Sequence, residues 1–484
     1  MIDTKALRSR VLDLAIQGKL TEQLESDGTA EELWQQIQAE KQRLIKVGKL
    51  KKEKPLPEIS EDEIPFEIPE NWKWVYLGEI FQHNTGKALN SANTDGKMLE
   101  YITTSNVYWD RFELKSLKQM CFTDDEIEKC TITKGDLLIC EGGDIGRSAI
   151  WCFDYDMRIQ NHLHRLRGYI SEINAKYYYY LMMLYKDKGM IDGRGIGLQG
   201  FSSKRVHSLI VPLPPLAEQK RIVSRVEEIF RLLDIIDAAQ EQYAADAESL
   251  KAKLITLGIQ GRLTEQLASD GTAEELYQQI QAEKQRLIKE GKIKREKPLP
   301  EISEDEIPFD IPENWKWVRL KTVLLSASTG PFGSMLHKSD YVEKGVPLIN
   351  PADIVNSTVS TRKIKKVAFQ KAEEMRSYRL VKGNIVIGRR GEMGRSAIIT
   401  EAEEGFLCGT GCFFIMPSDG LFAPYFIRLL QTNEMRECLR QGSVGSTMDN
   451  LNHSILENLP IPLPPLAEQK RIAEMLERVL DVLG

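Results

Sequence analysis

The sequence predicts an α+β protein: two globular mixed α/β domains joined by long antiparallel coiled-coil helices, in a pseudo-twofold, circularly organised chain. Three observations predict this class. Residues 18–77 recur at 261–320 with only eight differences. The segment PLPPLAEQKRI occurs at both 212–222 and 462–472. The regions between these repeats differ from each other, which indicates that one plan is used twice with two different inserts.

Five segments follow one another along the 484 residues. We expect an amino-terminal helical region at 1–67, a first variable domain at 68–211, a central helical region at 212–310, a second variable domain at 311–461 and a carboxy-terminal helix at 462–484. This length is typical of a chain with about three domains and ample apolar core.

The central helical region begins after Pro215 with a long apolar seam. Apolar residues recur there in alternating steps of four and three, and only the polar Gln240 interrupts them. The seam consists of Ile222, Val226, Ile229, Leu233, Ile236, Tyr243, Ala247, Leu250, Leu254 and Leu257. A period of 3.5 residues predicts a coiled-coil helix that needs a partner. An ordinary amphipathic core helix is the alternative.

The two ends of the chain contain the parts of a matching helix. The seam continues through Ile472, Leu476, Val479 and Leu483 at the carboxy terminus, and through Leu7, Val11 and Leu14 at the amino terminus. Joined end to end, these parts repeat the central helix except for the counterparts of 235–243. At 1.5 Å per residue, we predict that the termini lie within about 15 Å of each other on one helix axis.

Composition narrows the class of protein. The amino terminus lacks an apolar signal core, and no apolar run reaches the length of a membrane span, so we expect a cytoplasmic protein without membrane contact. Seven cysteines, an odd number, are expected to be reduced. Cys408 and Cys412 have no second pair or nearby histidine to complete a zinc site, so we expect no metal.

The net charge of −6 is unevenly distributed. Residues 77–211 carry 17 basic and 17 acidic side chains, and residues 320–461 carry 17 and 14. The acidity therefore lies in the repeats, and the variable regions are neutral to basic. Such a surface is compatible with DNA contact within a larger complex, although charge alone fits any soluble domain.

Several local patterns predict secondary structure. Thr29 and Glu32 form a capping box that opens a helix over about 30–46. A basic and then an acidic tether follow, and alternation around Trp72, Trp74 and Leu77 predicts a strand, as it does around Trp315, Trp317 and Leu320. KGDLLICEGGDIGRSAIW at 134–151 and KGNIVIGRRGEMGRSAII at 382–399 each predict a buried strand, a glycine turn and a second strand.

No catalytic motif is found. A phosphate loop is excluded because no Gly-Lys-Ser/Thr follows the glycines and no helix is predicted after them. Methyl transfer to a base needs an Asn/Asp-Pro-Pro-aromatic element, and the nearest sequence, Asn350–Pro351–Ala352–Asp353, lacks the aromatic residue. The six histidines form no metal or triad spacing. We therefore expect a non-catalytic chain.

Together, these parts resemble the specificity subunit of a type I restriction-modification system. The resemblance covers essentially the whole chain and rests on the alternation of variable and repeated regions, the FxIPxxWxW segment, the glycine turn after KGD or KGN, and PLPPLAEQKRI. It implies two target-recognition domains that each read one half of a bipartite double-stranded DNA target. It also implies that the repeats set the spacing and dock two modification subunits, through which restriction subunits join. No cofactor is implied on this chain, because S-adenosylmethionine and ATP are expected on the partner subunits.

Candidate base contacts follow from side-chain chemistry. Arginine favours guanine, and asparagine and glutamine favour adenine. The candidates are Gln160, Asn161, His162, Gln199, Ser203 and Lys204 in the first domain, and Arg389, Arg390, Thr447, Asn450 and Asn452 in the second. For each residue the alternative is a structural loop contact or simple solvation, since most protein contacts to DNA go to phosphate.

Two other functions remain open. The negative net charge fits a non-catalytic protein-interaction scaffold with two variable binding domains. A stand-alone methyltransferase or nuclease is disfavoured by the missing motifs. Steep salt dependence of DNA binding would separate DNA recognition from the scaffold, because phosphate contacts release counterions.

Overall fold

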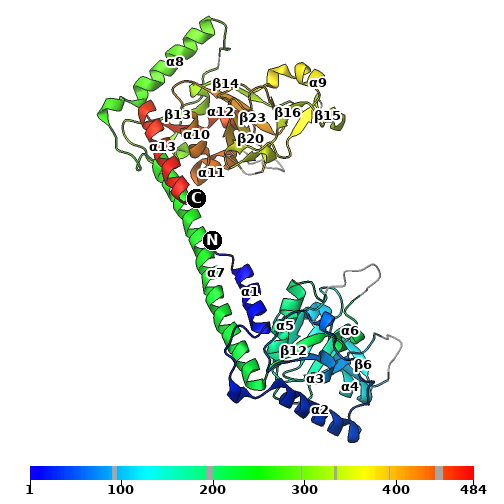
Figure 1. Cartoon of the computed structure of the whole chain (residues 1–484). Helices are drawn as coiled ribbons and strands as arrows, with labels where there is room; N and C mark the ends of the chain where they lie inside the picture. The colour runs from blue at the N-terminus through cyan, green and yellow to red at the C-terminus, as the bar shows by residue number, and fades with distance from the viewer. Residues whose placement is uncertain are drawn as a thin grey trace. The chain divides into compact units, whose positions relative to one another are not determined.

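The computed structural model describes residues 1–89, 95–191, 200–295, 297–331, 335–391, 393–441 and 451–483. The chain forms two compact units, Met1–Gln242 and Tyr243–Gly484. In Figure 1 the first unit is coloured blue to green and the second green to red. Each unit combines helices with antiparallel and parallel strands, which confirms the predicted α+β class with two mixed α/β domains. The long helix α7 (Leu216–Ile259) contributes residues to both units.

The first unit contains the amino-terminal repeat and the first variable domain. Its helices are α1 (Thr4–Ile16), α2 (Ala30–Lys46), α3 (Leu77–Ile80), α4 (Asp124–Cys130), α5 (Ala175–Asp187), α6 (Ser203–His207) and the first part of α7. Its strands are β1 (Lys73–Tyr76), β2 (Phe81–Thr85), β3 (Lys97–Ile102), β4 (Val107–Tyr108), β5 (Arg111–Phe112), β6 (Lys118–Phe122), β7 (Thr131–Ile132), β8 (Leu137–Cys140), β9 (Ser148–Ile150), β10 (Met157–Ile159), β11 (Leu163–Gly168) and β12 (Ile210–Leu213).

The second unit follows the same order of parts. Its helices after α7 are α8 (Ala273–Lys289), α9 (Phe369–Glu374), α10 (Ala423–Leu430), α11 (Asn433–Gln441), α12 (His453–Asn458) and α13 (Leu466–Leu483). Its strands are β13 (Lys316–Arg319), β14 (Leu324–Thr329), β15 (Tyr341–Val342), β16 (Val346–Ile349), β17 (Ile354–Val355), β18 (Thr358–Val359), β19 (Lys365–Val367), β20 (Ile385–Gly388), β21 (Ser396–Ile398), β22 (Leu407–Cys408), β23 (Cys412–Pro417) and β24 (Pro460–Leu463).

Each variable domain is built on two four-stranded sheets. In the first unit their strand orders are β2-β11-β8-β9 and β6-β3-β10-β7, and in the second β14-β23-β20-β21 and β15-β19-β16-β22. The strand, glycine turn and strand predicted from KGD and KGN are β8–β9 and β20–β21. Residues of β8 and β20 are fully buried, as their unbroken apolar runs require.

The repeated motifs meet at the base of each domain. β1 pairs with β12 so that Trp74 lies opposite Pro212, and β13 pairs with β24 so that Trp317 lies opposite Pro462. Proline has no backbone N–H to donate. It is tolerated in these two-stranded ribbons because each strand is an edge strand, with one side that needs no hydrogen bond to another strand. The predicted strand ends one residue earlier than expected, since Leu77 begins α3.

The predicted helix over about 30–46 is α2, and the capping box is confirmed. Glu32 N donates to Thr29 Oγ1 at 3.3 Å, and Thr29 N donates to the Glu32 carboxylate at 3.1 Å. The same reciprocal bonds link Thr272 and Glu275 at the start of α8. The local sequence therefore determines where both helices begin.

Each terminal helix packs antiparallel to α7 within its own unit. In the first unit, Thr4 bonds to Asp237, and Arg8 pairs with Asp234 at 2.7 Å and Asp237 at 3.0 Å. In the second unit, Ile472 and Leu476 of α13 form a core with Leu254 of α7. Gln240, the polar residue in the seam, accepts a bond from Ile2 N and donates to Ile2 O.

The predicted seam does not close along its whole length. Ile222, Val226, Leu233, Ile472 and Leu476 are buried; Ile229, Ile236, Leu254, Val11, Leu14, Val479 and Leu483 are half-buried. By contrast, Leu7, Leu250 and Leu257 remain 43%, 44% and 37% exposed. The reason at the amino terminus is that α1 turns Leu12, Ala15 and Ile16 into the first core, against α5. These three leucines are therefore not covered within the chain, and their part in a coiled-coil or partner-docking seam stays a prediction.

Candidate nucleic-acid interface

A buried glutamate fixes each domain to its helix. Glu218, at the start of α7, accepts bonds from Trp72 Nε1 at 2.7 Å and Gln23 Nε2 at 2.6 Å. Glu468, its counterpart in α13, accepts from Trp315 Nε1 at 2.8 Å and Gln266 Nε2 at 2.6 Å. Burial raises the pKa of both carboxyl groups, although these hydrogen bonds oppose the effect.

The next residue of the repeated motif holds a domain helix. Gln219 Oε1 accepts from Asn174 N at 3.1 Å, just before α5, and Gln469 Oε1 accepts from Phe422 N at 2.8 Å, just before α10. Both glutamines also donate to the carbonyl of a motif proline at 2.9 Å. Internal contacts of each unit therefore account for the identity of this glutamine in the two copies of the motif.

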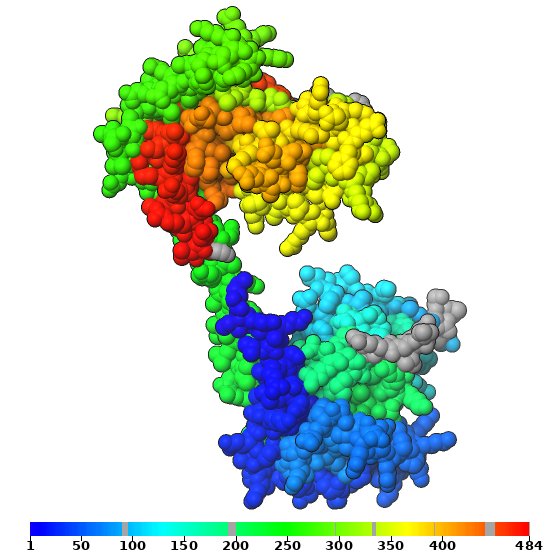
Figure 2. Space-filling view, turned by 45° about the horizontal axis from the view of Figure 1, so that its top comes forward, coloured from blue at the N-terminus to red at the C-terminus, as the bar shows by residue number. Residues whose placement is uncertain are grey.

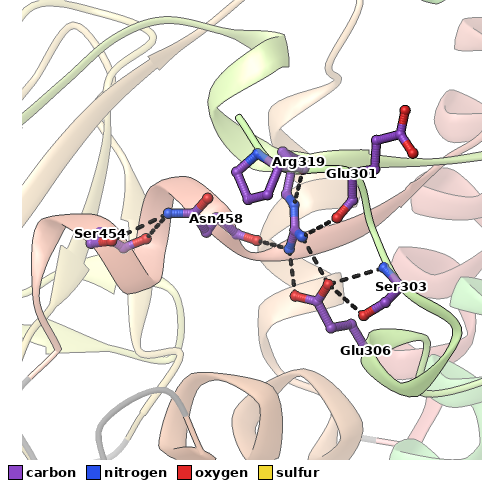
Figure 3. A network of polar contacts seen from close by, with 7 residues as sticks. Glu301, Ser303, Glu306, Arg319, Ser454 and Asn458 are labelled. Carbon is purple, nitrogen blue, oxygen red and sulfur yellow. Dashed lines mark hydrogen bonds and ion pairs between the residues drawn. The ribbon is translucent and has the colours of Figure 1, made fainter. Parts of the chain in front are cut away.

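One difference between the repeats changes how the acidic tether is held. In the second unit the buried Arg319 pairs with both oxygens of Glu306, at 2.7 and 2.8 Å (Figure 3). Arg319 also donates to the carbonyls of Pro300, Glu301 and Asn458 at 2.8–3.2 Å. This pairing lowers the pKa of Glu306 to about 2. In the first unit the counterpart is Tyr76.

In the first domain, three chain segments meet where β8 ends and α6 is about to begin. Phe201 N donates to Glu141 O at 3.0 Å, and Glu141 N donates to His162 O at 3.0 Å. The His162 ring nitrogen Nδ1 lies 3.4 Å from the Glu141 carboxylate. We call this place, formed by residues 141, 160–162 and 201–205, the α6 edge.

A buried histidine pair supports the α6 edge from inside. His164 Nε2 donates to Phe201 O at 2.7 Å, which leaves its Nδ1 to accept from His83 Nε2 at 2.9 Å. Burial lowers the pKa of His83 to about 3 and also lowers that of His164, so both rings are neutral near pH 7. The fixed tautomers hold the backbone that leads into α6.

The structure brings most of the first-domain candidates to the α6 edge. Gln160 is buried there, Asn161 is half-buried, and His162, Ser203 and Lys204 are exposed. Among the described residues, Asn161 Oδ1 is buried without a hydrogen-bond partner. Gln199 lies outside the described residues. The exposed side chains of His162, Ser203 and Lys204 are accessible for contact with DNA, whereas the buried Asn161 Oδ1 is not.

The second domain has the same backbone frame where β20 ends and α12 begins. Leu451 N donates to Arg389 O at 3.1 Å, and Arg389 N donates to Gly411 O at 2.8 Å. We call this place, formed by residues 389–390, 411 and 451–453, the α12 edge. The two edges share their hydrogen bonds, but the residue at the end of the strand is Glu141 in one and Arg389 in the other.

The second-domain candidates differ in their exposure and in the hydrogen bonds that they make within the domain. Arg389 Nε donates to Leu451 O at 3.1 Å, and the guanidinium lies 5.0 Å from the Phe413 ring, so this side chain helps to hold the edge together. Arg390 is exposed. Asn452 caps α12 by accepting from Ile455 N at 2.9 Å. Thr447 and Asn450 lie outside the described residues.

Three residues of the edges were missed by sequence reasoning. Glu141 aligns with Arg389 in the KGD and KGN segments, and this alignment could have identified it. Arg205 donates to Gly200 O at 3.2 Å and lies over the Phe201 ring at 5.4 Å. His453 packs on Phe413 with ring centroids 5.6 Å apart. The last two have no sequence signal, because they depend on how the strands pair.

Other kinds of site receive no support in the described part of the chain. There, no group of three or more His, Cys, Asp or Glu side chains could hold a metal ion. All seven cysteines are free thiols. No described helix is long and apolar enough to cross a membrane.

Comparison with known proteins identifies the class of these domains. The family model of the type I restriction modification DNA specificity domain matches residues 69–242 and 312–483. The chain therefore belongs to this family and carries two such domains. It is similar to the specificity subunits of the Escherichia coli type I restriction enzymes EcoEI and EcoAI. Identity is 27% for EcoEI, over 99% of this chain and 89% of that one, and 30% for EcoAI, over 79% and 72%.

Solved structures share the fold. The HsdS subunit from Thermoanaerobacter tengcongensis aligns with a TM-score of 0.53 and 20% identity, over 87% of this chain and 91% of that one. A chain from work on complex assembly and conformational transition of the type I R-M system aligns with a TM-score of 0.57 and 19% identity, over 87% and 92%. The architecture of this chain is thus that of a specificity subunit.

Proposed function

We propose that the chain is the DNA-recognition subunit of a type I restriction-modification complex, in which each variable domain reads one half of a bipartite target. The observation that carries this proposal is the pair of edges with one backbone frame and different side chains. A shared frame presents each edge to DNA in the same way, while Glu141 and His162 replace Arg389 and Gly411. Different donors and acceptors at one position favour different bases.

Exposed polar residues at the two edges supply the chemistry of recognition. Arg390 reads guanine through two parallel hydrogen bonds, and Asn161 and His162 contact base edges in the other half site. Lys204 contacts phosphate near the start of α6 and sets the orientation of the first domain. Arg389 positions the α12 edge, since its Nε is bonded to Leu451 O.

The helical repeats serve a second role in this proposal. They set the spacing of the two half sites and dock two modification subunits, through which restriction subunits join. The exposed leucines at equivalent positions, Leu7 and Leu250, support two equivalent docking surfaces, because they are identical in the repeats and nearly equally uncovered. The segments 1–67, 68–211, 212–310, 311–461 and 462–484 carry these separate tasks. The chain itself performs no catalysis and binds no cofactor; methyl transfer and ATP use belong to its partners.

Selection from a random duplex library tests the proposal. The full chain, together with its modification subunits, should enrich a sequence in two parts separated by an unspecified spacer. Its binding should weaken by orders of magnitude between about 50 and 200 mM salt, since several phosphates are contacted. No enriched sequence, with binding indifferent to salt, would instead support the protein-interaction scaffold.

A further inference from the structure

A cavity of about 950 Å³ lies in the second unit, between the variable domain and the helices at its base. Its walls come from α7, α10, α11, α13, the β17–β18 hairpin and the turn before β21. Figure 2 shows α10 (orange) and α13 (red) side by side on this unit. A cavity of this volume is large enough for a small-molecule ligand.

Basic side chains dominate the charged lining of the cavity. Lys251, Arg395, Arg428 and Arg436 enter it from four different elements. The lining also includes two carboxylates, Glu248 and Asp481, and Glu248 is bonded to Lys251 at 3.0 Å. Positive charge on a concave surface concentrates anions, because the low-dielectric walls focus the field.

Arg428 lies at the centre of a small polar network. Its Nη1 donates to Gln431 Oε1 at 3.2 Å, and Gln431 Nε2 donates to Ser357 Oγ at 2.6 Å. Burial lowers the pKa of Arg428, while the charges of Glu477 and Asp481 act in the opposite direction. An anion in the cavity would stabilise this partly desolvated cation.

The first unit has aromatic side chains at the positions that correspond to two cavity-lining residues of the second unit. Tyr180 lies six residues after Asn174, and Arg428 lies six residues after Phe422, whose backbone N–H makes the equivalent bond to the repeated motif. Tyr180 is thus the counterpart of Arg428.

The counterpart of Leu480 is Phe230, from the register of PLPPLAEQKRI. In the first unit the Tyr180 and Phe230 rings pack together with centroids 5.8 Å apart. Arg428 and Leu480 replace both rings in the second unit, and the space becomes a charged cavity. The two units therefore differ at this place in side chains that line the cavity, although they share the surrounding frame.

We propose that this cavity of the second unit is a binding site for a phosphate group. The planar guanidinium groups of Arg395 and Arg428 match phosphate oxygens, Lys251 adds a point charge from α7, and Ser357 supplies a neutral donor. The phosphate comes either from a free polyphosphate or from the backbone of bound DNA. The second source rests on the proposed function, whereas the first does not.

Thermal unfolding of the full chain with sodium pyrophosphate tests the free ligand. At constant ionic strength, the Tm of the wild type should rise with the logarithm of pyrophosphate concentration. The double variant Arg428→Tyr/Leu480→Phe, which copies the first unit, should lose this rise, and Lys251→Gln should weaken it. Arg286→Gln, an exposed arginine of α8 paired with Glu283, is the matched control and should behave as the wild type.

Salt-dependent DNA binding tests the other source. If pyrophosphate has no effect, Lys251→Gln and the double variant should each lower the salt slope of DNA binding by about 1, with Arg286→Gln unchanged. Either result supports the site and distinguishes its ligand. The site is refuted if none of these variants alters pyrophosphate stabilisation or the salt slope, or if Arg286→Gln alters them equally. If the wild type does not bind DNA at all, the proposed function is refuted. The pyrophosphate experiment then decides by itself whether the phosphate site exists.

Discussion

Trp72 donates its indole N–H to Glu218 at 2.7 Å, and this bond joins the start of the first domain to the start of α7. Trp315 and Glu468 make the same bond in the second unit, at 2.8 Å. These contacts explain why the tryptophan and the glutamate are identical in both repeats. Each domain is fixed to a helix by the same side chains, so the sequence between them can vary without changing how the domain is mounted.

Replacing Glu218 should loosen the first unit. Glu218→Ala leaves Trp72 Nε1 and Gln23 Nε2 without their acceptor in a buried site, and hydrogen bonds to charged groups contribute about 1.5–3 kcal/mol each. We expect a loss of about 2–4 kcal/mol in the free energy of unfolding, measured by urea titration. Glu468→Ala is the matched variant of the second unit. Stability equal to the wild type in both would contradict the anchoring role.

The Arg319–Glu306 pair should make the second unit sensitive to acid. The pKa of Glu306 is lowered from 4.5 to about 2, so the stability it contributes is present above pH 4.5 and is lost as the pH falls towards 2. Because the Glu306 side chain is 37% exposed, solvent screening limits this contribution to about 1 kcal/mol.

Arg319→Tyr copies the first repeat and should remove that pH dependence. Unfolding by urea at pH 7 and at pH 4 measures the difference between variant and wild type. The variant should be less stable at pH 7, and the gap should narrow on acidification. A gap that is constant with pH would show that Arg319 acts by packing alone.

Asp136 and Asn384 occupy the same place in KGD and KGN but should respond differently to exchange. Asp136 is buried and pairs with Arg167 through both oxygens, at 2.6 and 2.7 Å. Asp136→Asn should therefore cost about 1.5–3 kcal/mol in unfolding free energy. Asn384→Asp buries a carboxylate beside Ile415 O and should destabilise the chain at pH 7 but less at low pH, where the carboxyl is protonated. If the unfolding free energies of the two variants depended on pH in the same way, the different roles of Asp136 and Asn384 would be contradicted.

Substitutions of exposed and of buried apolar residues in the helices should distinguish residues that bind the modification subunit from residues that stabilise the fold. Leu250→Ser and Leu7→Ser change exposed side chains, so they should alter stability by less than about 0.5 kcal/mol but weaken co-purification of the modification subunit. Ile222→Ala removes a buried side chain and should cost about 2–5 kcal/mol. If the serine variants retain full binding of the modification subunits, the exposed leucines are not a docking surface.

Local sequence patterns were sufficient to predict several helices and strands of both units. The capping box at Thr29 gave the start of α2, the repeated motif gave the start of α7 and α13, and unbroken apolar runs gave β8 and β20. These features depend on neighbours a few residues away, and the repeats showed each of them twice. The circular arrangement of the termini stays a prediction.

The α6 edge and the α12 edge could not be predicted from local sequence patterns. Glu141, His162 and Phe201 come together only because β8 and β11 pair in one register and the chain returns before α6. The sequence contains no signal for that register, so the bond from Arg389 Nε to Leu451 O could not be predicted, and base contact by Arg389 stays a prediction. The charged cavity likewise depends on which side chain fills a three-dimensional space.

Arg390→Ala tests base recognition in the second half site. An exposed arginine that makes a bidentate contact to guanine contributes about 1–3 kcal/mol of discrimination. We expect relaxed specificity at one base pair of that half and no change in the other half, measured by competition among single-base variants of the selected target. Lys204→Gln should instead weaken binding to all sequences and lower the salt slope by about 1. Uniform weakening by Arg390→Ala would assign it to phosphate.

The most direct measurement is methylation mapping across a genome in cells that express this chain with its modification and restriction partners. Exchange of residues 78–211 for the corresponding region of another specificity subunit should change one half of the methylated sequence and leave the other half and the spacer unchanged. A change in both halves, or methylation without any sequence preference, would contradict the assignment of one half site to each domain.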